Sequence, residues 1–320
     1  MLGINRRMIL ETAKYYIIVA LLLIPLPLAG DYVTHVAILV MLYTITAASL
    51  DILVGYTGRL SLGHAAFFAV GAYTSTLLAM NLGVSPWIGI FAGGIMASIF
   101  GLILGIPSLK LRGPYLAIAT LGFGVVVWLM LINLDWLTRG PLGIPGIPPL
   151  PGIGPIDFRN KVSFYYVALL FTVISIFLLH LLTKSRAGRI FVAIREDEDA
   201  ALSIGVDVPL FKVYAFLVAT FFAGISGGLY AHYLRYISPE ISTLSESIYM
   251  LSMTIIGGFG TLIGPVMGAI VLSLLQELLR SYLEYRYLIY GLLIVLVMRF
   301  FPKGIYGIIE LLLEKAGGGK

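Results

Sequence analysis

The residues that could carry chemistry in this chain are few and scattered. Its four histidines, His35, His64, His180 and His232, are far apart and have no metal-ligand spacing. The absence of cysteine excludes a thiolate nucleophile, a thiolate metal site and a disulfide framework. There is no phosphate-binding loop, no H-E-x-x-H motif and no nucleophile elbow. The sequence therefore predicts a chain that is not an enzyme, that does not hydrolyse ATP by itself and that binds no cofactor or metal.

A glycine-rich break between two apolar runs is the first informative segment. Glycine lets the backbone leave the helix, but at membrane depth this is tolerated only inside protein or beside water. Polar side chains there are costly unless they are paired or hydrated. The pattern favours an unwound helix that lines a solute path; the alternative is a cytoplasmic turn whose small residues allow close helix packing. With a second break further along the chain, the candidate pathway residues are Gly55, Gly58, Arg59, Ser61, Gly63, His64, Gly257, Gly258 and Gly260.

The densest cluster of charges lies at 183–212 and is the second informative segment. After a basic stretch, acidic residues stand where the first turn of a helix favours them, good helix formers follow, and a glycine ends the pattern. The pattern predicts a short amphipathic helix that docks a cytoplasmic partner; the alternative is a solvated loop. The candidate docking residues are Arg195, Glu196, Asp197, Glu198, Asp199, Ala200, Ala201 and Gly205.

Composition identifies the class of protein that must position these segments. Hydrophobic residues make up 59% and charged residues 12% of the 320 residues, with a mean hydropathy of +1.00, whereas soluble domains carry about 25% charge. This excludes a soluble enzyme with one anchor and a disordered chain. It predicts an all-α polytopic membrane protein, one transmembrane domain over 1–320, with about ten helices. The apolar segments are 15–29, 35–54, 62–80, 86–106, 115–133, 162–182, 210–231, 246–260, 262–283 and 286–301.

Glycines and a proline interrupt the pair at 246–283, so the count is eight if this pair is re-entrant. With the N-terminus inside, most of the 21 lysines and arginines fall on the inner side, which predicts that both termini are cytoplasmic. The same bias explains the net charge of +5 without nucleic-acid binding. The outer basic residues are Arg139, Arg159, Lys161, Arg235, Arg280 and Arg286.

Three connecting or terminal segments complete the expected topology. The segment 134–161 is rich in proline and glycine, so it is expected to be non-helical and to lie outside the membrane. The charged segment 183–212 is expected to lie inside. The last residues, 316–320, read as a flexible tail.

Taken in order along the chain, these segments resemble the branched-chain amino acid ABC transporter permease family, LivM type. Asp199-Ala200-Ala201-x-x-x-Gly205 also resembles the E-A-A-x-x-x-G core of the importer coupling loop, with Asp for Glu, although the isoleucine and Leu-Pro that follow in the full motif are not at their expected spacing. The segments that carry the likeness are Gly55–Phe67, Thr138–Pro148, Ala193–Val206, Ile256–Pro265 and Pro302–Ile305.

The resemblance implies one subunit of a heteromeric importer in the plasma (inner) membrane of a prokaryote. Its partners would be a second related permease, two cytoplasmic ATP-binding subunits that hold ATP and Mg, an extracytoplasmic solute-binding protein and the lipid bilayer. Alternating access would carry leucine, isoleucine, valine or similar small polar solutes inward. Related permeases carry urea, short amides or sugars. The alternative from another class is a stand-alone secondary transporter or channel, with Asp51, Arg59, His64 and Glu246 as candidate ion-coupling residues.

Overall fold

The computed structural model describes Leu23 and residues 26–111, 113–152, 154, 156–279, 286–301 and 304–307. The predicted first span at 15–29 lies outside the described residues except for Leu23 and 26–29. The predicted tail at 316–320 and the outer Arg280 also lie outside them.

Helices make up most of the described chain, as the sequence predicts. Every predicted apolar segment from 35–54 onward coincides with one helix in its described part, because each is long, apolar and bounded by glycine, proline or polar residues. These helices are α2 (Asp31–Asp51), α3 (His64–Asn81), α4 (Pro86–Gly105), α5 (Pro114–Asn133), α7 (Lys161–Lys184), α10 (Val208–Leu234), α11 (Leu244–Gly257), α12 (Ile263–Leu278) and α13 (Arg286–Phe300).

Shorter elements lie between and before these helices. The helical ones are η1 (Leu26–Ala29), η2 (Ile52–Tyr56), η3 (Pro107–Lys110), α6 (Asp135–Thr138), η4 (Gly140–Leu142), α8 (Arg186–Glu196), α9 (Glu198–Ser203) and η5 (Pro239–Ser242). Two short strands, β1 (Ile144–Pro145) and β2 (Tyr236–Ile237), pair antiparallel, with Ile144 opposite Ile237.

Five helices in the described chain are long and apolar enough to cross a membrane: the continuous helix Asp31–Tyr56, α4, α5, α7 and α10. In contrast, α11 has 14 residues and α12 has 16. At 1.5 Å per residue they are roughly 21 and 24 Å long, shorter than the bilayer's hydrocarbon core of about 30 Å. The interrupted pair at 246–283 therefore consists of two short helices joined by a glycine turn, as expected for a broken or re-entrant element.

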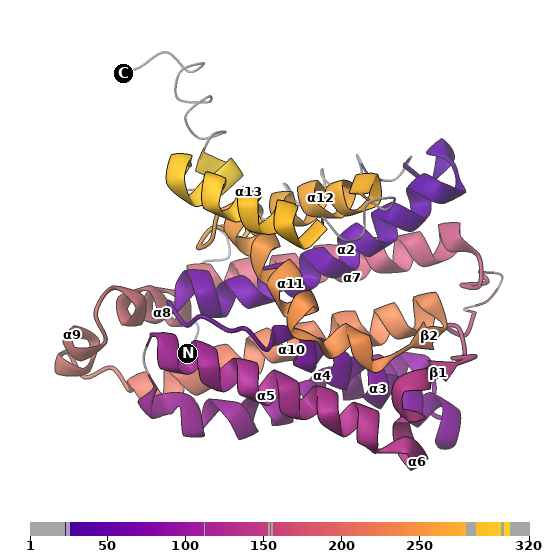
Figure 1. Cartoon of the computed structure of the whole chain (residues 1–320), viewed down its shortest axis with the longest axis horizontal. Coiled ribbons are helices and arrows are strands. Elements are labelled where there is room, and N and C mark those ends of the chain that lie inside the picture. The colour runs from indigo at the N-terminus through magenta and orange to yellow at the C-terminus, as the bar shows by residue number, and fades with distance from the viewer. Residues whose placement is uncertain are drawn as a thin grey trace.

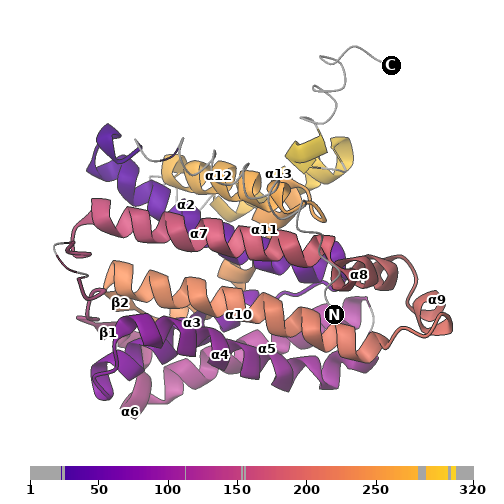
Figure 2. The ribbon, with the colours of Figure 1, turned by 180° about the vertical axis from the view of Figure 1, so that it is seen from behind.

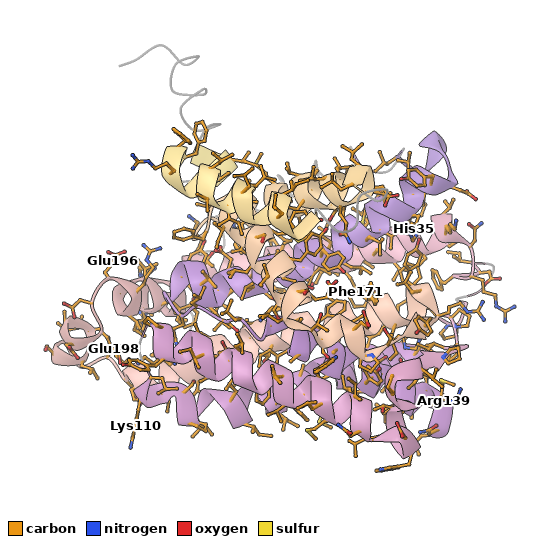
Figure 3. The ribbon with its side chains drawn as sticks, viewed as in Figure 1. His35, Lys110, Arg139, Phe171, Glu196 and Glu198 are labelled. Carbon is orange, nitrogen blue, oxygen red and sulfur yellow. The ribbon has the colours of Figure 1, made fainter. Side chains whose placement is uncertain are left out.

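The long helices run side by side and give the molecule two distinct ends (Figures 1 and 2). One end carries α8 and α9, and the other carries α6 and the strand pair. Charged side chains mark both ends: Lys110, Glu196 and Glu198 lie at the first, and Arg139 lies at the second (Figure 3).

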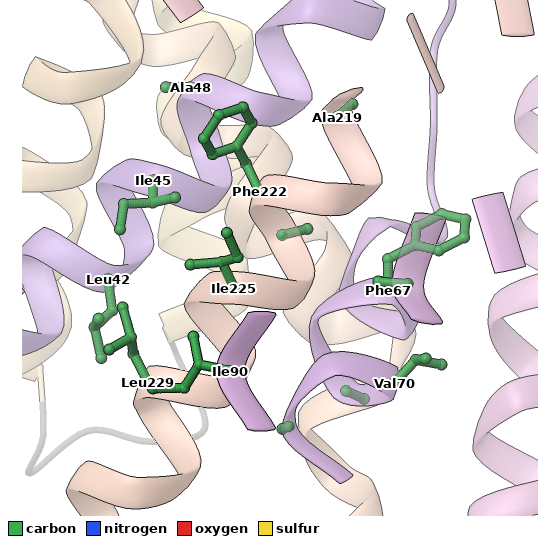
Figure 4. Close-up of a cluster of buried hydrophobic side chains, with 14 of the residues drawn as sticks. Leu42, Ile45, Ala48, Phe67, Val70, Ile90, Ala219, Phe222, Ile225 and Leu229 are labelled. Carbon is green, nitrogen blue, oxygen red and sulfur yellow. The ribbon is translucent and has the colours of Figure 1, made fainter. Parts of the chain in front are cut away.

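Close glycine contacts hold the centre of the bundle together. A Cβ added to Gly93 or Gly224 would meet backbone of the facing helix, and a Cβ on Gly101 would meet Thr220. The small-residue stripes of α4 and α10 are therefore helix contacts. Beside them, Leu42 and Ile225 belong to the buried apolar cluster between α2 and α10 (Figure 4).

The segment 134–161 is largely irregular, but the prediction that it contains no helix was wrong. Asp135–Thr138 forms one helical turn, because the first proline of the segment comes only at Pro141. The Thr138 hydroxyl donates to the carbonyl of Leu131 at 2.7 Å and anchors this turn to α5.

Candidate functional site

The charged segment forms two helices, α8 and α9, where the sequence predicted one. Ser185 caps α8 by accepting from the N–H groups of Ala187 and Gly188. Asp197 has an extended backbone, which ends α8, and its carboxylate accepts from Asp199 N at 2.9 Å and Ala200 N at 3.0 Å, which starts α9. The helix that the acidic run predicts is therefore α9. The preceding basic run, for which the sequence analysis predicted no structure, forms the amphipathic helix α8.

The last turn of α8 contacts the first glycine break. Arg195 Nη1 donates to the carbonyl oxygen of Gly55 at 2.7 Å, and its Nη2 bonds Glu196 Oε1 at 2.6 Å. The stem of Arg195 also packs on Gly58, where an added Cβ would lie 3.0 Å from Arg195 Cγ. Gly58 has φ +66, a conformation that favours glycine.

Asp51 joins the first glycine break to the second. This carboxylate is fully buried in the last turn of α2, and its Oδ1 accepts from Gly260 N at 2.7 Å. A Cβ on Gly55 would overlap both the Asp51 carboxylate and the backbone nitrogen of Gly260. The residues Asp51, Gly55, Gly58, Arg195 and Gly260 thus form one packed unit, which we call the glycine joint. It connects α2, the turn between α11 and α12, and α8.

Two buried cations make contacts between the elements that surround the glycine joint. Lys212, on α10, forms an ion pair with Glu198 of α9 and donates to the carbonyl of Leu109 at 3.3 Å. Arg59 donates to the carbonyl of Ser108 at 2.8 Å. Burial lowers the pKa of Arg59 to about 10, so it stays protonated at neutral pH. The helix α9 is therefore anchored to α10 through the buried Lys212, and Arg59 holds the first glycine break to η3.

The other predicted pathway residues are not part of the joint. Ser61 and His64 are fully buried, and His64 Nε2 is 3.1 Å from Ser49 Oγ. Gly63 packs against the backbone of Thr120 in α5, and Gly257 packs against the carbonyl of Gly264. Each of these glycines makes a close backbone approach, as the packing interpretation predicts. The structure thus places Gly55, Gly58 and Gly260 together with Arg195, but not with Ser61, Gly63 and His64.

A cavity of about 230 Å³ lies between the central turns of α5 and the start of α11. None of the nine predicted pathway residues lines it. The signal available in the sequence was the run of hydroxyl residues just before the short apolar segment at 246–260. Its lining residues are Leu62, Leu121, Gly124, Val125, Trp128, Ser242, Thr243, Leu244, Ser245 and Ser247.

Comparison with known proteins places this architecture in a family. The family described as "Branched-chain amino acid transport system / permease component" matches residues 32–298, which include both glycine breaks and the charged segment. The chain belongs to this family. As a member of a transport permease family, it is a transport subunit and not an enzyme, and its predicted resemblance is confirmed.

Relatives of this permease come from bacteria and an archaeon. It is 38% identical to the high-affinity branched-chain amino acid transport system permease protein LivM of Escherichia coli K12, over 84% of this chain and 69% of that protein. It is 24% identical to the probable branched-chain amino acid transport permease protein LivM of Methanocaldococcus jannaschii, over 86% of this chain and 93% of that protein. The high-affinity branched-chain amino acid transport system permease protein LivH of Escherichia coli K12 is 23% identical, over 83% of this chain and 91% of that protein. No solved structure matches.

Proposed function

We propose that this chain is the LivM-like permease subunit of an ATP-driven importer that moves leucine, isoleucine and valine inward by alternating access. Three kinds of observation support this. The family match covers most of the chain, and the relatives with 36–38% identity bear the name of high-affinity branched-chain amino acid transport permeases. The described chain is a bundle of apolar helices with the charged helices α8 and α9 at one end.

The glycine joint is the observation that carries the mechanism. ATP and Mg would bind to two separate cytoplasmic subunits, and their closure would move α8 and α9. Arg195 would pass this motion to Gly55 through the 2.7 Å hydrogen bond, and Asp51 would pass it to Gly260. Because packed interfaces switch between discrete arrangements, a small shift of α8 would move both glycine-broken segments together.

The charge pattern supports a cytoplasmic position for the α8–α9 end in a prokaryotic inner membrane. Lys110 lies at this end (Figure 3), and Arg186 and Arg189 belong to α8, which lies there too. Cytoplasmic connections of membrane proteins are rich in such residues. Both termini would then face the cytoplasm, and 134–161 would lie outside.

A solute-binding protein would dock on the outer end. There the segment 134–161 is held in place by the β1–β2 pair and by His232, whose Nδ1 lies 2.7 Å from the carbonyl oxygen of Pro148. A cavity of about 500 Å³ opens beside Pro148, Pro151 and Arg159. The likeness to both LivM and LivH supports a complex that contains two related permeases.

The polar residues that a stand-alone secondary transporter would use for ion coupling have structural partners here. Asp51 holds Gly260, Arg59 holds Ser108, and Glu246 accepts from the Tyr43 hydroxyl at 3.3 Å. The match to a transport-system permease family favours the importer over a stand-alone transporter. Urea, short amides and sugars remain alternative solutes of the same family.

The first experiment is to crosslink native membranes, purify this chain in mild detergent and identify the bound proteins by mass spectrometry. Two ATP-binding subunits, a second permease and leucine uptake by the reconstituted complex would support the proposal. A chain recovered without ATP-binding subunits after crosslinking would overturn it.

A further inference from the structure

The cavity between α5 and the start of α11 has two chemically different walls. One wall is apolar and comes from Leu62, Leu121, Val125 and Trp128; the other, which we call the hydroxyl wall, comes from the hydroxyl-bearing residues Ser242, Thr243 and Ser245. Sites for small molecules combine mostly apolar walls with a few polar groups that fix orientation. This combination suits a ligand with one aliphatic and one polar side.

The cavity also lies near the middle of the bundle along the direction of its long helices. The α5 residues that line it, 121–128, occupy the middle turns of a helix that runs from Pro114 to Asn133. The second wall reaches the same depth, because the Ser247 hydroxyl accepts from Ala65 N at 3.2 Å in the first turn of α3. Transport sites formed by broken helices lie near the middle of the membrane in the same way.

The helix α11 connects this cavity to the glycine joint. It begins at the hydroxyl wall and ends at Gly257, directly before the turn whose Gly260 is held by Asp51. A shift of the joint along α11 would therefore change the width of the cavity. In this arrangement one rigid helix of 14 residues joins the charged segment to the cavity.

We propose that this cavity receives the aliphatic side chain of the transported amino acid, with its polar end toward the hydroxyl wall. The inference rests on the proposed function and adds the site to it. On the open side of the cavity, Val125 is 39% and Leu244 is 40% exposed. Because a zwitterion cannot face lipid, the second permease of the complex would close this side.

The chain contains no cysteine, so single cysteines can report on the cavity without background in this subunit. We would prepare Val125→Cys and Ser245→Cys in the full complex and measure, by mass spectrometry of this chain, how fast a small polar thiol reagent modifies them. Leucine should slow modification of both, and alanine should require roughly tenfold higher concentrations, since a methylene in an apolar pocket is worth at least that much. The control is Val126→Cys, which is 53% exposed on α5 and does not line the cavity.

The outcomes separate this inference from the proposed function. If the wild-type complex takes up leucine but leucine leaves both modification rates unchanged, the site is wrong and the proposed function stands. Equal slowing at Val126→Cys would also overturn the site, because it would indicate a general closure. If the complex does not take up leucine, both proposals fall. Should Ser245→Cys fail to assemble, Leu121→Cys provides a second reporter on the apolar wall.

Discussion

Arg195 Nη1 and the carbonyl oxygen of Gly55 lie 2.7 Å apart although 140 residues separate them in the chain. Arg195 therefore points from the charged segment into the membrane-embedded part of the bundle. The sequence assigned Arg195 to the coupling loop and Gly55 to the solute path, and the structure joins these two assignments in one contact.

Replacing Arg195 with alanine tests whether this contact carries the coupling. The full complex should still assemble and hydrolyse ATP at its basal rate, but stimulation by the solute-loaded binding protein should fall about tenfold or more, since a hydrogen bond from a charged donor is worth about 1.5–3 kcal/mol. The measurement is stimulated against basal ATPase activity in proteoliposomes. Glu196→Gln is the matched control, because it removes only the Arg195–Glu196 pair, in which Glu196 is 68% exposed. Normal stimulation of Arg195→Ala would refute the coupling role.

Gly55→Ala should damage transport more than an ordinary helix substitution. The added Cβ would overlap the Asp51 carboxylate and the nitrogen of Gly260, so one of the three joined elements must move. We expect loss of uptake and a lower melting temperature. On Gly122 of α5 an added Cβ meets nothing within 4 Å, so Gly122→Ala should keep uptake and gain about 0.5–1 kcal/mol from helix propensity. Equal uptake by the two variants would show that transport does not require the close packing of Gly55 against Asp51 and Gly260.

Glu198→Gln should lower the stability of the complex as well as its coupling, because it leaves the buried Lys212 cation without its ion-pair partner. Breaking a buried pair on one side costs about 3–5 kcal/mol. Thermal melting of the purified complex measures this loss. The double variant Glu198→Gln/Lys212→Met should recover part of it. A melting temperature that is unchanged in Glu198→Gln would mean that the pair contributes nothing.

Asp199→Lys, on the same helix, tests docking without removing a buried ion pair. It reverses a charge in the first turn of α9, which costs about 0.3–1 kcal/mol through the helix dipole. The fold should therefore survive, while stimulation of ATPase activity should be lost if α9 docks an ATP-binding subunit. Unchanged stimulation would remove α9 from the docking surface.

The sequence predicts the apolar helices well because length, hydropathy and proline or glycine boundaries are local properties. It also predicts the acidic first turn of α9. The partner of Arg195 is a backbone carbonyl 140 residues away, and no local pattern reports it. Asp51 reads as a possible ion-coupling residue, yet its carboxylate holds the turn at Gly260. The cavity was missed because its walls come from α5 and the start of α11, which meet only in the folded bundle.

His232 fixes the outer segment, and its replacement should affect docking of the solute-binding protein. Its Nδ1 lies 2.7 Å from the carbonyl oxygen of Pro148, and its Nε2 lies 2.8 Å from Ser75 Oγ, so the ring connects α10 to both the outer segment and α3. Because an ordered loop loses less entropy on binding, His232→Ala should weaken the binding protein's affinity and speed proteolysis within 134–161. His35→Phe is the control, since His35 contacts Tyr233 at the same end without touching Pro148. If both variants bind the solute-binding protein as tightly as the wild type does, then the ordering of 134–161 by His232 does not contribute to docking.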